Sequence, residues 1–144
     1  MATLTGFTQF LAAELLDHIH TDAAYSPAAT LYAALSTTTP TEESGGSPPW
    51  NFTEPAGGGY ARIATTAATW DAATDADPSV KSNGAKIDFG QASGASWGTI
   101  TYFGLFDAIT VGNLLLGGAL TASKEIADGD FAEFPIGDWD ETLD

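Results

Sequence analysis

The chain has 144 residues, 44% of them hydrophobic and 16% charged, a composition typical of one folded globular domain rather than of a disordered chain. Nineteen acidic residues against four basic ones give a formal charge of −15, which repels phosphate backbones and anionic membranes. We therefore expect no nucleic-acid partner and no membrane partner. The absence of cysteine excludes disulfides, thiolate metal sites and cysteine nucleophiles.

The N-terminal region carries no basic residue ahead of an apolar run, and no stretch approaches about 18 consecutive apolar residues. The sequence thus predicts neither a signal peptide nor a membrane span. We expect a protein that folds in an aqueous compartment.

Residues 5–20 are predicted to form a helix with Thr5 as its N-cap. Apolar residues recur there at four-residue spacing, at Phe7, Leu11, Leu15 and Ile19. Because such a stripe is stable only when covered, we expect this helix to pack against another element.

From Leu31 onward the apolar period changes to two, and Gly, Pro, Asn and Asp clusters interrupt the chain at short intervals, as in antiparallel β domains. Strands are predicted at residues 30–36, 59–70, 86–89, 98–106 and 113–120, with a final pair flanking the Asp128-Gly129-Asp130 turn. The expected fold is mainly β: an antiparallel β-sandwich, jelly-roll or Ig-like, with one N-terminal α-helix. We expect one domain over residues 1–144, with the helix at about 5–20 and the sandwich at about 28–140.

Two features refine this expectation. Residues 102–106 are apolar on both faces, which predicts a central strand covered on both sides. Long polar connections are expected at residues 37–58 and 71–84, and such loops are often functional. The first ends in Gly57-Gly58-Gly59, which we expect to supply positive φ or a close backbone approach.

Polar clusters give no convincing catalytic or metal site. His18 and His20 lie two residues apart and cannot share one ion on a helix. Asp residues at 71, 75 and 77, and at 128 and 130, have the oxygen-rich look of calcium loops but lack the EF-hand spacing, so turn formation explains them better. We therefore predict no catalytic residue, no cofactor and no metal.

Four tryptophans offer a carbohydrate-binding alternative, because aromatic rings can form a sugar-stacking platform: Trp50, Trp70, Trp97 and Trp139. Tryptophans at strand ends more often cap a core, however. A glycan hydrolase would need two carboxylates held about 5 to 10 Å apart in a cleft, and no pair in this acidic chain stands out.

Several stretches together resemble a family of short phage proteins known as phage tail fibre proteins. They are residues 27–36 (PAATLYAALS), 53–62 (TEPAGGGYAR), 97–108 (WGTITYFGLFDA), 112–115 (GNLL) and 118–120 (GAL), preceded by the N-terminal helix. The resemblance covers most of the chain from Leu4 to about Phe134. It implies a virion component with a β-sandwich fold and no catalytic residues. The chain departs from the family pattern in its longer 37–58 loop and in its acidic tail, residues 138–144.

A fibre that spans distance needs a coiled coil, intertwined β structure or repeats, and this sequence has no such pattern. We therefore expect a compact, non-enzymatic domain on the exterior of a tailed phage, as a tail fibre or tail accessory protein assembled in the host cytoplasm. A capsid decoration protein and a host-surface carbohydrate-binding module remain alternatives. The expected partners are other virion proteins, of capsid or tail, and copies of the chain itself in a homo-oligomer, with a host surface glycan as a further possibility.

Overall fold

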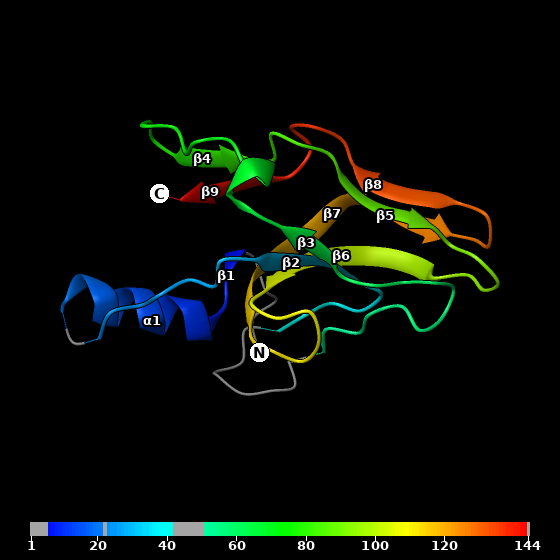
Figure 1. Ribbon diagram of the computed structural model, residues 1–144, viewed down its shortest axis with the longest axis horizontal. Helices are drawn as coiled ribbons and strands as arrows, with labels where there is room; N and C mark the ends of the chain where they lie inside the picture. Colours follow the sequence, from blue (N-terminus) through cyan, green and yellow to red (C-terminus); the bar gives the residue numbers. More distant parts are fainter. Residues whose placement is uncertain (1–5, 22, 42–50, 144) are drawn as a thin grey trace.

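The computed structural model describes residues 6–21, 23–41 and 51–143. Within these residues one antiparallel sheet, called here the main sheet, lies at the centre of the molecule (Figure 1). Its strands in spatial order are β1 (Gly6–Phe7), β7 (Leu114–Ile126), β6 (Gly98–Phe106), β2 (Leu31–Ser36) and β3 (Ile63–Thr65).

Two antiparallel ribbons lie above one face of the main sheet in Figure 1 and form a second layer. One pairs β4 (Ser79–Ser82) with β9 (Asp140–Leu143), and the other pairs β5 (Ile87–Gln91) with β8 (Phe131–Phe134). Side chains from both layers share one apolar core, in which Phe89 and Trp139 of the upper layer pack with Ile100 and Leu105 of β6. The fold is thus mainly β and antiparallel with a sandwich arrangement, as predicted.

Strand β6 has the predicted bounds and lies between β2 and β7. Ile100 and Leu105 belong to the core between the layers, whereas Phe106, which is 0% exposed, belongs to a second cluster with Ala34 and Leu114. The prediction of a central strand that is apolar on both faces is confirmed.

Helix α1 spans Gln9–Ile19 and begins later than expected. Its N-cap is Thr8, whose side-chain oxygen accepts a hydrogen bond from the Leu11 N–H and whose hydroxyl contacts the Leu114 carbonyl at 2.7 Å. The predicted cap Thr5 lies outside the described residues. Residues 6–7 are not helical because they pair as β1 with Leu116 and Gly117 of β7, so tertiary pairing overrides the helical pattern.

Two predicted segments are corrected by long-range pairing. The predicted loop 71–84 contains β4, and the acidic tail contains β9, which pair with each other. The predicted strand at residues 59–70 is reduced to β3 and a 3-10 turn at Ala67–Thr69, because Gly57, Gly58 and Gly59 all have positive φ and the chain reaches β3 only at Ile63. Residues 42–50 of the first predicted loop lie outside the described residues.

No helix in the described part of the chain has the length and hydropathy needed to cross a bilayer.

Candidate binding groove

A groove made of two adjoining pockets follows β7 on the side of the main sheet that the ribbons cover. Its larger part has a volume of about 520 Å³ and lies between β7 and β8, and its smaller part, of about 370 Å³, lies between β1, β7 and β9. Phe103 and Ala119 line both parts, so the two lie side by side. We call this feature the β7 groove.

The floor of the β7 groove is apolar. Leu35, Phe89, Ile100 and Ile126 are buried core residues that also line it. Phe103 lies at the junction of the two parts, edge-on to Trp139 with ring centres 4.4 Å apart. A side chain at Gly118 would place its Cβ 3.1 Å from the Phe103 ring, so glycine at this position gives the ring room.

Runs of consecutive residues from two strands line the larger part of the groove. A strand that presents one face contributes every second residue, because its side chains alternate. Here residues 119–122 of β7 and all of Phe131–Phe134 in β8 line the larger part. Among the described strands, β8 pairs with β5 alone, so its other edge has no strand partner.

A register shift separates β7 from its neighbour at the same place. Ile100 pairs with Lys124 and Tyr102 with Ala119, so four residues of β7, 120–123, lie opposite Thr101. Such an insertion disrupts the ladder and bends the longer strand. Part of the β7 backbone beside the groove therefore lacks its regular partner in β6.

The rim of the β7 groove is acidic. Glu133, Asp138 and Asp140 are exposed along it with one basic residue, Lys124, whereas Glu141 lines the smaller part as a partly buried side chain. Lys86, outside the groove, contacts Glu133 at 2.9 Å and Asp88 at 2.7 Å. Burial raises the pKa of Glu141, and the hydrogen bond from the Trp139 indole offsets part of that rise.

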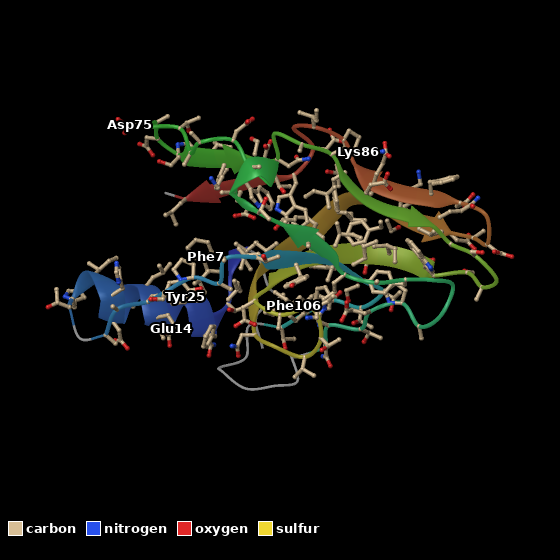
Figure 2. All side chains as sticks on the ribbon, in the orientation of Figure 1. Phe7, Glu14, Tyr25, Asp75, Lys86 and Phe106 are labelled. Carbon is tan, nitrogen blue, oxygen red and sulfur yellow. The ribbon has the colours of Figure 1, made fainter. Side chains whose placement is uncertain are left out.

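A buried polar cluster on the opposite face of β6 was not singled out from the sequence. Arg62, whose side chain is 6% exposed, forms an ion pair of 2.8 Å with Glu54 and donates to the carbonyls of Ala108 and Val111. Its guanidinium carbon lies 3.6 Å from the centre of the Phe106 ring, which Figure 2 labels in the main sheet. This cluster ties the 53–62 segment to the loop between β6 and β7.

Tyr60 extends that cluster toward the core. Its hydroxyl donates to Glu54 at 3.0 Å and accepts from the Leu35 N–H at 2.8 Å. Burial and the neighbouring Glu54 carboxylate raise the pKa of Tyr60, so the phenol stays neutral. The Glu54 and Arg62 charges are held in fixed hydrogen bonds, which is the arrangement of a structural ion pair.

Both histidines and the aspartates Asp128 and Asp130 fill structural roles. His18 Nδ1 accepts a hydrogen bond from the Tyr25 N–H, and His20 is the C-cap of α1. Asp128 and Asp130 accept hydrogen bonds from Gly94 and Ala127 around the predicted turn. In the described ranges no three His, Asp or Glu side chains come together as ligands for an ion.

The tryptophans cap the core, as expected for strand-end residues. Trp97 is 2% and Trp139 is 1% exposed, so neither ring offers a face to a sugar. Trp70 packs edge-on against Trp139 with ring centres 5.6 Å apart. Trp50 lies outside the described residues. Two of the four tryptophans proposed for a sugar-stacking platform are therefore buried and cannot stack on a sugar.

The comparisons with known proteins agree with the resemblance in the sequence. No curated protein matches the chain. Residues 6–142 match the family described as podophage GP4 fiber I protein gp80, so the match spans α1, the main sheet and both ribbons. The chain belongs to this family of podophage fibre proteins, which makes it a virion component.

Proposed function

We propose that the protein is a non-enzymatic tail fibre or tail accessory protein that serves as a compact knob rather than as a fibre shaft. The family match over residues 6–142 is the observation that carries this proposal. The knob role is supported by the fold, because α1 has 11 residues and the strands form short antiparallel pairs within one chain. A shaft needs elements that extend over long distances, such as a coiled coil or intertwined strands.

The acidic groups of the β7 groove support a non-enzymatic role. Glu133 accepts from Lys86, Asp140 from the Ser82 hydroxyl, and Glu141 from the Trp139 indole. Three of the four groove carboxylates thus have a partner in the fold itself. A glycan hydrolase would need two of them free to face a sugar.

Self-association belongs to the same proposal. Helix α1 extends from the end of the main sheet that lies away from the β5–β8 ribbon (Figure 1). Leu16 and Ile19 on this helix are exposed apolar side chains, with Leu15 partly buried beside them. Residues three and four apart share one face of a helix, and a second copy covering this face would bury them.

Copy number and location on the particle test the proposal. We expect antibody labelling to place the protein on the tail, and quantitative mass spectrometry to find far fewer copies than of the major capsid protein. Labelling over the whole capsid, at a copy number close to that of the capsid protein, would instead identify a decoration protein.

A further inference from the structure

We propose that the β7 groove binds an extended segment of a partner polypeptide, whose side chains alternate between apolar and basic, and which adds as a strand beside β8 and the shifted part of β7. That the partner is another virion protein rests on the proposed function. The binding mode itself rests on the groove.

The backbone is the first argument for an extended ligand. Among the described strands β8 has one edge without a strand partner, and residues 120–123 of β7 lie opposite the single residue Thr101. Unpaired N–H and C=O groups at such edges are ready to pair with an added strand. The groove lies between the main sheet and the β5–β8 ribbon, so an inserted segment would contact both.

The floor is the second argument. Every second side chain of an inserted strand would point inward, toward Ile100, Phe103 and Phe134. Phe131 at the margin of the groove is 64% exposed, so a ligand would also cover an apolar ring that now faces water. Apolar side chains at alternate positions therefore suit this floor.

The acidic rim favours a basic ligand, which argues against a second copy of this acidic chain as the occupant. The outward side chains of an inserted strand would meet the exposed residues Glu133, Asp138 and Asp140, together with Lys124. The chain has four basic residues in all. They are Arg62, Lys81, Lys86 and Lys124, and no two of them lie two residues apart, as basic residues on one face of a strand would. No segment of this chain offers the alternating basic residues that the rim favours.

A synthetic peptide of about nine residues with alternating valine and lysine is the probe, since strands are commonly five or six residues long. We expect it to bind the purified full-length protein in fluorescence anisotropy at physiological salt. A peptide of the same composition, with its valines in one block and its lysines in another, keeps the charge but loses the alternation. It should bind at least about tenfold more weakly. Equal binding of the two peptides would reduce the interaction to charge and overturn the proposal.

Paired variants place the probe in the groove. Ala122→Trp fills the larger part, and Ala73→Trp makes the same change in the exposed loop before β4. Asp138→Lys reverses a rim charge, and Asp75→Lys reverses one at the tip of that loop, which Figure 2 shows far from β8. We expect each groove variant to weaken binding by about fivefold or more and each control to change it by less than about twofold.

A measurement independent of variant folding is amide hydrogen exchange on the unaltered protein. The bound peptide should slow exchange at residues 120–123 and in β8, because added strands form backbone hydrogen bonds there. Absence of peptide binding, or protection confined to other segments, would contradict the proposal. So would self-association of the protein that Ala122→Trp abolishes, because the occupant would then be a second copy. These outcomes do not depend on where the protein lies on the particle, which tests the proposed function separately.

Discussion

The indole N–H of Trp97 donates a hydrogen bond of 2.9 Å to the carbonyl oxygen of Gly58. The same oxygen accepts a second bond from the Ser93 N–H at 3.0 Å. These bonds attach the 53–62 segment to the turn that enters β6. The glycine run predicted to be a conformational requirement is therefore also a close approach between two distant parts of the chain.

Gly58→Val should lower the melting temperature or the soluble yield. Gly58 has a φ of +58°, and a Cβ there would lie 2.4 Å from the Ala95 carbonyl oxygen and 2.8 Å from the Trp97 ring. Gly57 also has a positive φ but nothing within 4 Å of its Cβ position. We expect Gly57→Ala to cost about 1 kcal/mol from backbone strain alone, and Gly58→Ala clearly more. Equal melting temperatures for the two alanine variants would show that the contact with Trp97 is not limiting.

Arg62→Ala should destabilise the protein by about 3 to 5 kcal/mol, because it leaves the Glu54 carboxylate without its partner. Arg62→Lys keeps the charge but cannot reach Glu54 and both loop carbonyls at once, so it should lie between Arg62→Ala and the parent protein. Lys86→Ala removes the exposed ion pairs and should leave the urea midpoint nearly unchanged. Urea unfolding curves of the three variants measure this order of destabilisation. A destabilisation by Lys86→Ala as large as that by Arg62→Ala would contradict it.

Phe103→Ala should cost about 3 kcal/mol, since the ring contacts both Phe134 and Trp139 and lines both parts of the β7 groove. Phe131→Ala removes a ring of the same size that is largely exposed, and we expect a much smaller effect. Thermal denaturation followed by circular dichroism compares them. A shift of no more than a few degrees for Phe103→Ala would mean that the ring does not contribute to the core.

Glu141→Gln should stabilise the protein near neutral pH and have little effect well below pH 4.5. Burial raises the pKa of Glu141 above its ordinary value of 4.5. The folded state therefore binds the carboxyl proton of Glu141 more tightly than the unfolded chain does. The stability that this proton contributes is lost as the pH rises through the pKa of Glu141 in the folded state. Glutamine can keep the bond from the Trp139 indole without a buried charge. Melting curves near neutral pH and well below pH 4.5 test this prediction, with Glu125→Gln as an exposed control. A stabilisation by Glu141→Gln that does not change with pH would contradict the prediction.

The sequence predicted the elements whose apolar pattern is strong. Strand β6 has the predicted bounds, β2 differs by one residue, and α1 lies within its predicted range. The pair β4 and β9 was missed because both strands are polar and one lies in the acidic tail, so their pairing is decided by tertiary contacts. The buried Trp139 just before β9 is the signal that could have indicated an ordered tail.

The β7 groove could not be predicted in the same way. It depends on the register shift opposite Thr101 and on the placement of β8 and β9 beside β7. Neither leaves a local pattern, because the residues that line the groove alternate in no regular period and come from both layers. The ion pair of Glu54 with Arg62 lies inside a segment that carried the family resemblance, but the sequence does not show that the pair is buried.

A density map of the intact phage particle tests the central claim most directly. We predict density for this fold at the tail, as a knob at the end of or beside an elongated component, with a strand of a neighbouring protein in the β7 groove. Density for the fold distributed over the capsid lattice, or its absence from the particle, would contradict the account.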